Sequence, residues 1–222
     1  MASYREVLHK AKQEMEAAGR GEQAALFYML ELTNKEAHNL YMEFEEEMPL
    51  DIQSAYEAGI KRLVAGEPLG HVLGFEWFYG YRFKVNEDVL IPRPETEELV
   101  ANVLAAYDEY FSNVENVMAV DIGTGSGAIA ISLKKEEPNL HMMATDISEK
   151  AVLVAKDNAQ ENEAIVSFLV GDMLQPLIER DIKVDILISN PPYIPKEEVM
   201  EDSVVNYEPH VALFGGEDGL KF

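Results

Sequence analysis

Asn190, Pro191, Pro192 and Tyr193 carry the most specific chemistry in this sequence, directly after an apolar segment. The amide oxygen of Asn190 can accept a hydrogen bond from an N–H₂ group. The Pro191 carbonyl is a stiff second acceptor, because two consecutive φ angles are restricted there. Tyr193 supplies a flat face. Together these groups suit a planar –NH₂ on an sp² carbon, as in an amide or a nucleobase.

Such a nitrogen is a poor nucleophile, because its lone pair is delocalised. Two acceptors on its hydrogens would orient it and stabilise the charge that builds on nitrogen as it attacks an activated methyl group. No dedicated base is needed if the proton leaves after the nitrogen becomes cationic, so positioning carries most of the rate. The alternative interpretation of these residues is an ordinary strand exit.

A glycine-rich loop, Asp121-Ile122-Gly123-Thr124-Gly125-Ser126-Gly127-Ala128, is the second candidate site. Its glycines permit a sharp turn and close approach of a ligand, and the next helix begins with unpaired N–H groups. Asp146, after the next apolar segment, can accept hydrogen bonds from both ribose hydroxyls of an adenosine cofactor. Asp172 could accept from an adenine amino group, and Met173 could cover the ring. These residues leave NAD and S-adenosylmethionine open, and a tight turn or a helix cap without a ligand are the structural alternatives.

Alternating strands and helices must position these residues. Strands are predicted at 117–123, 141–147, 166–172 and 184–190, with helices near 127–136 and 148–161. Near-continuous apolar strands that alternate with helices predict an α/β fold with a parallel sheet covered on both faces. Ligands bind at the carboxyl ends of such strands, and we expect the fourth strand to neighbour the first, which brings Asn190 to the glycine loop.

The sequence before this sheet has a different pattern. Residues 1–70 contain only helical periodicity and predict a small helical domain. Its first helix begins at a capping box of Ser3 and Glu6, and a later helix is expected to start at Thr33. Residues 71–91 are rich in aromatic residues, with a turn signal at Gly80, and predict a β-hairpin that links this domain to one over 92–222.

Composition limits the function further. Lys and Arg number 18 against 41 Asp and Glu, a formal net charge of −23, which argues against a broad nucleic-acid footprint. Cys is 0, so a disulfide framework and a thiolate metal site are excluded, and no metal site is predicted. No run of 18 apolar residues or basic-then-apolar leader is found, so we expect a cytoplasmic protein without a membrane segment.

The motifs together resemble a known family. Residues 121–127 with Asp146 resemble the S-adenosylmethionine site of the seven-stranded methyltransferases, and "NPPY" (190–193) resembles their amino-group-methylating branch. The stretches "GEPLGHVLGFEWFYGYRFKVNEDVLIPRPETEELV" (66–100) and "NYEPHVALFGGEDGLKF" (206–222) are similar to the release factor glutamine methyltransferases, the HemK/PrmC family.

This resemblance implies a Rossmann-like methyltransferase sheet and a specific reaction. The family moves a methyl group from S-adenosylmethionine, leaving S-adenosylhomocysteine, to the side-chain amide of the Gly-Gly-Gln glutamine in class I peptide release factors. The implied cofactor-binding residues are Asp121, Ile122, Gly123, Thr124, Gly125, Asp146, Asp172, Met173 and Asn190. The implied substrate-binding residues are Asn190, Pro191, Pro192 and Tyr193, with Asn190, Pro191 and Tyr193 as the catalytic group. The helical domain is expected to bind the release factor, and the enzyme to be a monomer.

Two departures from the family pattern are expected to matter. Relatives often have an aromatic residue at the position of Met173. The family sheet has three more strands, so we expect this sequence to be part of a longer chain that continues for roughly 50 residues. In the sequence as it stands, the fourth strand would lack its outer neighbour and leave an exposed edge.

Other functions are also compatible with parts of this pattern. A nucleic-acid amino-group methyltransferase, acting on DNA adenine or RNA guanine, would use the same Asn190–Tyr193 device. A non-catalytic adaptor could use a methyltransferase fold for binding alone, and an NAD oxidoreductase could use the glycine loop. Arg93-Pro94-Glu95-Thr96 is a signature of the family to which the residues themselves assign no role.

Overall fold

A computed structural model describes residues 2–222 of this chain. These residues divide into two compact units, which we describe one at a time. The first contains the residues up to Gly74 together with Glu201–Tyr207, and the second contains Phe75–Met200 with Glu208–Phe222. No helix in the described part of the chain is long and apolar enough to cross a membrane.

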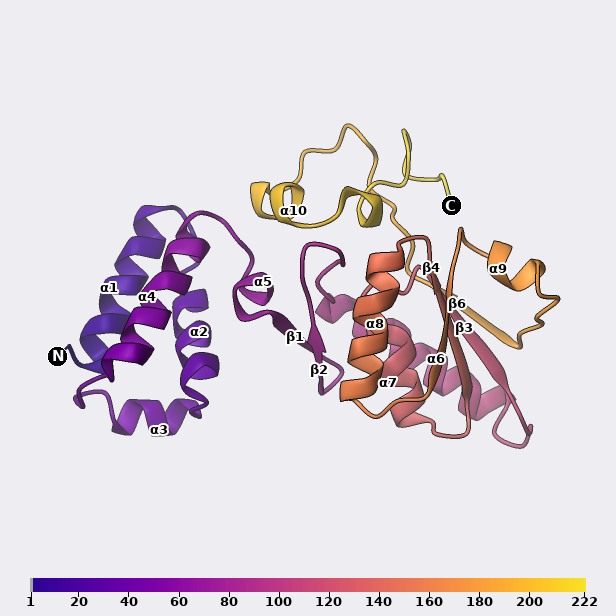
Figure 1. The fold of residues 1–222 in the computed structure, drawn as a ribbon, viewed down its shortest axis with the longest axis horizontal. Coiled ribbons are helices and arrows are strands. Elements are labelled where there is room, and N and C mark those ends of the chain that lie inside the picture. The colour runs from indigo at the N-terminus through magenta and orange to yellow at the C-terminus, as the bar shows by residue number, and fades with distance from the viewer. Residues whose placement is uncertain (1) are drawn as a thin grey trace. The chain divides into compact units, whose positions relative to one another are not determined.

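The first unit is built from helices only. Helices α1, α2 and α4 run side by side, and α3 lies across one end of them (Figure 1). The bounds are α1 Tyr4–Ala17, α2 Gln23–Thr33, α3 Ala37–Met42, α4 Leu50–Val64, α5 Leu69–Leu73 and α10 Asp202–Tyr207.

The predicted capping box begins α1 and is confirmed. The Ser3 hydroxyl accepts from the Glu6 N–H (3.3 Å), and the Glu6 carboxylate accepts from the Ser3 N–H (2.9 Å). The predicted helix start at Thr33 is wrong. Asn34 takes a left-handed φ of 50°, which ends α2, so Thr33 is the last residue of α2 and its hydroxyl donates to the Met29 carbonyl (2.7 Å).

Two stacked tyrosines form the centre of this unit. The rings of Tyr28 and Tyr56 lie 5.5 Å apart, and the Tyr56 hydroxyl donates to the Ala25 carbonyl at 2.8 Å. Burial raises the pKa of Tyr56 well above its usual range. A Cβ at Gly59 would overlap the Tyr28 ring, so this glycine allows α2 and α4 to approach closely.

The second unit opens with the predicted hairpin, which is formed by β1 (Phe75–Phe78) and β2 (Tyr81–Lys84). Tyr79 and Gly80 join the strands with φ angles of 51° and 78°. Two left-handed residues make the type I′ turn that matches the twist of a two-residue hairpin.

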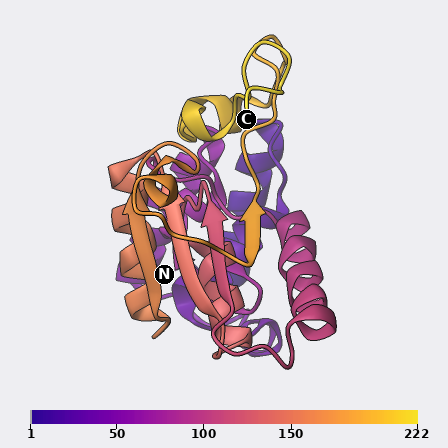
Figure 2. The same cartoon turned by 90° about the vertical axis from the view of Figure 1, so that its right-hand side faces the viewer.

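A four-stranded parallel sheet forms the core of the second unit, and its order is β5-β4-β3-β6. Figure 2 shows the four strands with their arrowheads at the same end. The prediction that the fourth strand neighbours the first is therefore confirmed. The strands are β3 Met118–Ile122, β4 His141–Asp146, β5 Val166–Val170 and β6 Ile186–Ser189.

Helices cover both faces of this sheet. Helices α7 and α8 pack on one face and the short helix α9 lies on the other (Figure 1). The bounds are α6 Glu97–Tyr110, α7 Ala128–Glu136, α8 Glu149–Glu161 and α9 Gln175–Ile178, with short 3₁₀ helices at Pro94–Thr96 and His210–Ala212. Strand β6 is an edge strand, and its Leu187 side chain is 53% exposed.

Candidate active site

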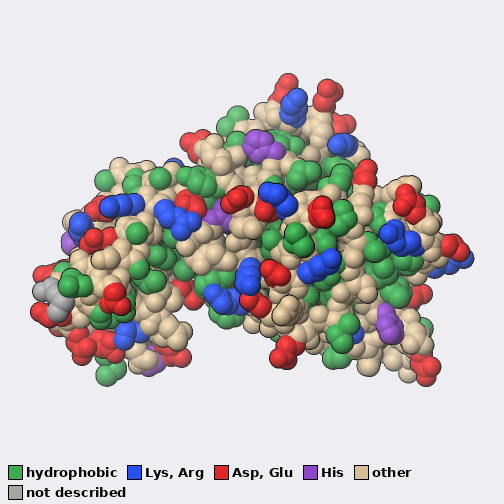
Figure 3. All heavy atoms as spheres, viewed as in Figure 1, with side chains coloured by type: hydrophobic (Ala, Val, Ile, Leu, Met, Phe, Trp, Pro, Cys, Tyr) green, Lys and Arg blue, Asp and Glu red, His purple; other side chains and the backbone are tan. Residues whose placement is uncertain are grey.

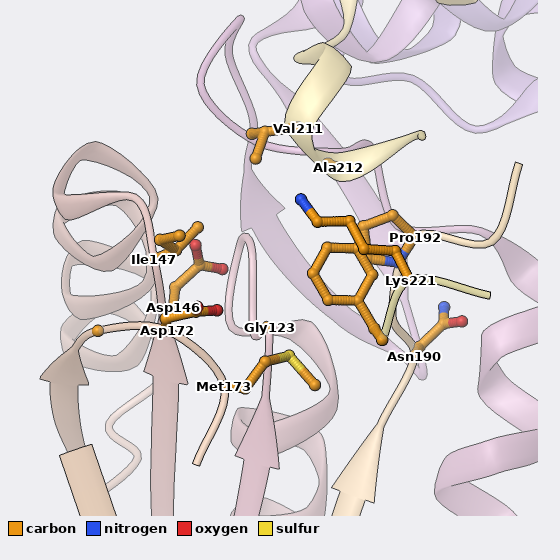
Figure 4. Close-up of a pocket in the computed structure, with 12 residues that line it drawn as sticks. Gly123, Asp146, Ile147, Asp172, Met173, Asn190, Pro192, Val211, Ala212 and Lys221 are labelled. Atoms are coloured by element: carbon orange, nitrogen blue, oxygen red, sulfur yellow. The ribbon is translucent and has the colours of Figure 1, made fainter. Parts of the chain in front are cut away.

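A cavity of about 180 Å³ lies where the four parallel strands end. Figure 4 shows Asp146 and Asp172 on one side of it and Asn190 with Pro192 on the other. Its lining consists of Gly123, Asp146, Ile147, Gly171, Asp172, Met173, Asn190, Pro192, Val211, Ala212, Lys221 and Phe222. The fold therefore brings together six of the predicted site residues, from all four strand ends.

A smaller cavity of about 60 Å³ lies next to the first and shares Gly123 and Asn190 with it. The glycine loop lines this cavity through Thr124 and Gly125, and Arg93 and Thr96 also line it. Gly123 and Asn190 therefore border both spaces.

The glycine loop is held by the neighbouring strand. The N–H groups of Gly123 and Thr124 both donate to the Thr145 carbonyl (2.9 Å each). A Cβ at Gly127 would lie 2.9 Å from Ile131 Cδ1 and 3.1 Å from Ala155 Cβ, so this position requires glycine for packing as well as for its φ of 84°. A Cβ at Gly123 or Gly125 would meet no atom within 4 Å. The loop is thus open toward a ligand at these two glycines and tightly packed at the third.

Asp146 connects this loop to the next helix. One carboxylate oxygen accepts from the Gly125 N–H (2.8 Å), and the other accepts from the Ser148 N–H (2.9 Å). The Ser148 hydroxyl in turn accepts from the Ala151 N–H (3.2 Å) and caps α8. Helix capping and a carboxylate at the cavity are therefore compatible, since different residues perform them.

Asp121 lies beneath the loop, where it is fully buried. Its carboxylate accepts from the Thr124 hydroxyl at 2.6 Å. Burial raises the pKa of Asp121 to about 7; the Thr124 hydrogen bond opposes this shift and the charge of Asp146 adds to it. Asp121 and the neighbouring Ile122 line neither cavity. Any action of Asp121 on a ligand must therefore pass through the loop above it.

Asp172 and Met173 reach the larger cavity through a tight turn after β5. The Gly171 N–H donates to the Asp146 carbonyl (2.9 Å), and the Thr145 hydroxyl donates to the Met173 carbonyl (3.3 Å). Met173 itself has a left-handed φ of 47°. These contacts turn the chain so that an acid and an apolar side chain face the same space.

Asn190 follows β6 and is held from the side of α6. Its Nδ2 donates to the Thr96 hydroxyl at 3.2 Å. Pro192 lines the larger cavity, whereas Pro191 and Tyr193 line neither. Tyr193 is 69% exposed, so its ring is free to cover a substrate that arrives from outside.

Sequence reasoning missed Glu208, a buried acid that pairs with Arg93. The Glu208 side chain is 1% exposed, and it accepts from the Ile91 N–H (3.0 Å) and from Arg93 Nη2 (2.5 Å). Both partners lie in the stretch that ends with the Arg93–Thr96 signature. The sequence did offer one signal for this pair. Arg93 and Glu208 have opposite charges and lie in the two stretches, 66–100 and 206–222, that resemble the family.

Two known families match parts of this chain. The family described as "Methyltransferase small domain" matches residues 102–207, and the family "PrmC N-terminal domain" matches residues 6–74. The first match covers the parallel sheet and the ends of its strands, and together with the relatives described next it places the protein among the methyltransferases.

More specific similarity comes from whole relatives. A release factor glutamine methyltransferase of Bacillus anthracis is 42% identical over 219 residues, which are 98% of this chain and 77% of the relative. One from Bacillus subtilis is 42% identical, with 98% and 76% covered. The chain belongs to the release factor glutamine methyltransferase family. Among solved structures, the hMettl16 catalytic domain in complex with the MAT2A 3′UTR hairpin 6 is 16% identical, covers 76% of this chain and 59% of its own, and has a TM-score of 0.47.

Proposed function

We propose that this methyltransferase methylates the side-chain amide nitrogen of the Gly-Gly-Gln glutamine in class I release factors. The observation that carries the proposal is the place of Asn190, which borders both cavities opposite the glycine loop. No hydrogen bond occupies its Oδ1 within residues 2–222, so that oxygen can accept from an incoming N–H₂.

S-adenosylmethionine, which supplies an activated methyl group, fits the residues of the two cavities. Ile147 and Met173 are apolar walls for an adenine ring, and Asp172 is an acceptor beside them. Asp146 uses two acceptor sites on the protein, and a carboxylate has about four, so it retains capacity for ribose hydroxyls. Gly123 and Gly125 are open where a ligand would contact the backbone.

The smaller cavity suits the amino-acid end of the same cofactor. The Arg93 side chain is 38% exposed, and this cavity lies between Arg93 and the glycine loop. A cation and backbone N–H groups together favour a carboxylate. The proposed cofactor-binding group is therefore Gly123, Thr124, Gly125, Asp146, Asp172, Met173 and Asn190 in contact, with Asp121 and Ile122 supporting the loop.

Asn190 and its neighbours act on the substrate by positioning. Asn190 Oδ1 and the Pro191 carbonyl would accept from the two hydrogens of the amide, and Tyr193 would cover its plane. Charge then builds on nitrogen while these acceptors are already in place, which lowers the barrier without a catalytic base.

We infer that the helical unit binds the release factor. Residues 6–74 match the PrmC N-terminal domain, and four large apolar side chains of this unit are more than half exposed. They are Phe27, Tyr41, Met42 and Leu50. We further propose a cytoplasmic monomer without stable nucleic-acid binding, since basic side chains are interspersed with acidic ones in Figure 3 and the net charge is −23.

Methyl transfer from tritiated S-adenosylmethionine tests the proposal. Purified release factor should be labelled, and the same factor with its Gly-Gly-Gln glutamine replaced by alanine should not. Label that enters DNA or RNA but not release factor would show a nucleic-acid methyltransferase instead. Absence of cofactor binding by calorimetry would support a non-catalytic adaptor.

A further inference from the structure

The two ends of the Asn190 amide are nearly equal in shape but opposite in hydrogen bonding. The oxygen accepts from a substrate N–H₂, whereas the Nδ2 group would present donors to donors. Packing alone does not hold an exposed side chain in one place, so a polar contact is needed to keep the amide at the site. Asn190 is exposed.

The Thr96 hydroxyl is the group that contacts Nδ2. It lies 3.2 Å from Asn190 Nδ2, although the two residues are 94 positions apart. With Nδ2 directed at Thr96, Oδ1 is left for the substrate. Both residues line the smaller cavity, so the contact lies at the wall of the site.

Within residues 2–222, the hydrogen bond of the Thr96 hydroxyl is the one with Asn190. Thr96 is the N-cap residue of α6, where threonine commonly accepts from the first turn. Here the side chain makes no capping hydrogen bond. The chain is already helical at Thr96 (φ −74°, ψ −15°), so its hydroxyl is not directed at the first turn of α6 and contacts Asn190.

Thr96 is also held firmly enough to orient its partner. Its N–H donates to the Arg93 carbonyl (2.9 Å) within the 3₁₀ helix, and Arg93 pairs with the buried Glu208. Threonine is restricted at χ1 because it is β-branched. The position of the Thr96 hydroxyl is thus set by the 3₁₀ helix, which the Arg93–Glu208 pair anchors.

We propose that Thr96 is a positioning residue for methyl transfer, which holds the Asn190 amide at the wall of the site with Oδ1 available to the substrate nitrogen. This inference rests on the proposed function for the identity of that nitrogen. The position of the Asn190 side chain rests on the Thr96–Asn190 contact alone. The inference gives the Arg93–Thr96 stretch a role that the sequence left unassigned.

Two variants separate the hydroxyl from the shape of the side chain. Thr96→Val removes the hydroxyl at nearly constant volume, and Thr96→Ser retains it. We expect kcat at saturating cofactor to fall about tenfold in Thr96→Val, the effect of one hydrogen bond that holds Asn190, with Tm unchanged. Because Thr96 also lines the smaller cavity, the cofactor Kd is measured separately and should stay within a few fold. Thr96→Ser should keep most of the wild-type rate. Ser112→Ala, at an exposed position after the other end of α6, is the matched control.

A double mutant tests whether Thr96 acts through Asn190. In an Asn190→Ala background, Thr96→Val should have no further effect, because the amide to be oriented is gone. An equal loss in both backgrounds, or a wild-type rate in Thr96→Val, overturns the proposal. If the wild type labels a nucleic-acid base instead of release factor, the proposed substrate fails, and the same variants are compared on that acceptor.

A measurement without turnover completes the test. The Asn190 side-chain N–H₂ signals, assigned by their loss in Asn190→Ala, should exchange with solvent more slowly in the wild type and in Thr96→Ser than in Thr96→Val. Equal exchange in all three proteins would show that the hydroxyl does not hold the amide.

Discussion

Arg93 Nη2 donates to the Glu208 carboxylate at 2.5 Å, although the two residues are 115 positions apart in the chain. The pair is asymmetric, since the Arg93 side chain is 38% exposed and the Glu208 side chain is 1% exposed. The Ile91 N–H adds a third group to it. The return of the chain after Tyr193 is therefore anchored to the stretch that carries Thr96.

The asymmetry of this pair predicts unequal costs of losing each partner. Arg93→Met leaves a buried carboxylate without its cation, and we expect the free energy of unfolding to fall by about 3 kcal/mol. Glu208→Gln leaves a cation that water can reach and keeps a polar partner for Ile91, so a loss of about 1 kcal/mol is expected. Trp77, the one tryptophan in the sequence, lies in β1 of the same unit and reports urea unfolding by fluorescence. Equal losses in the two variants would contradict this picture.

The buried Asp121 predicts a pH-dependent stability. Its folded pKa is raised to about 7, whereas an unfolded aspartate titrates near 3.8, so the folded state holds a proton that the unfolded state has lost between these values. The free energy of unfolding therefore falls as pH rises from about 4 to about 7, by an amount on the order of a few kcal/mol.

Asp121→Asn should remove this contribution, because the amide does not titrate. Urea unfolding of wild type and variant is measured at pH 5 and at pH 8. The stability of the wild type relative to the variant should be lower at pH 8 than at pH 5, and the size of that decrease is the contribution of Asp121. Asp157→Asn, an exposed position on α8, is the control. A difference that is the same at both pH values would mean that Asp121 ionises normally in the folded protein.

Removal of the proposed acceptor predicts a loss of turnover rather than of cofactor binding. Asn190→Ala should lower kcat about a hundredfold, the scale seen when one preorganised group at a reacting centre is lost. The cofactor Kd should stay within a few fold, since Asp146, Asp172 and the glycine loop remain. Single-turnover kinetics and calorimetry measure the two quantities, with Asn113→Ala as an exposed control. A wild-type rate would exclude the acceptor role.

Asp146 predicts the opposite pattern. Asp146→Asn removes the charge and one acceptor beside Gly125 and Ser148, so we expect the Kd for S-adenosylmethionine to rise about tenfold or more. At saturating cofactor, kcat should recover most of its wild-type value. Calorimetric titration with S-adenosylhomocysteine is the check, and unchanged affinity would place the ribose elsewhere.

Much of the parallel sheet could be predicted from sequence, because its rules are local or topological. Apolar segments alternate with helices, and a doubly wound sheet then puts the fourth strand beside the first. The order of the strands alone was therefore enough to place Asn190 opposite the glycine loop. Cap chemistry likewise located the start of α1 at Ser3, since the partner Glu6 is three residues away.

The residues that sequence reasoning missed act over long separations or through burial. The Glu208–Arg93 pair and the Thr96–Asn190 contact join distant segments and leave no periodic pattern. Asp121 is fully buried, which no local sequence pattern indicates, so a residue expected to contact the cofactor lies beneath the glycine loop instead. The capping pattern of Thr33 with Glu36 wrongly predicted a helix start at Thr33. Thr33 is instead the last residue of α2, because Asn34 is left-handed and ends that helix.

The position of β6 in the sheet also has a consequence for biosynthesis. Strand β3 can pair with β4 as soon as both have left the ribosome, but its other edge must wait for β6, whose Ser189 hydroxyl donates to the Ile122 carbonyl across 67 positions. Chains emerge from the amino end, and distant pairings close late. The glycine loop and Asp146 therefore leave the ribosome before Asn190, which can join them only after β6 has paired with β3.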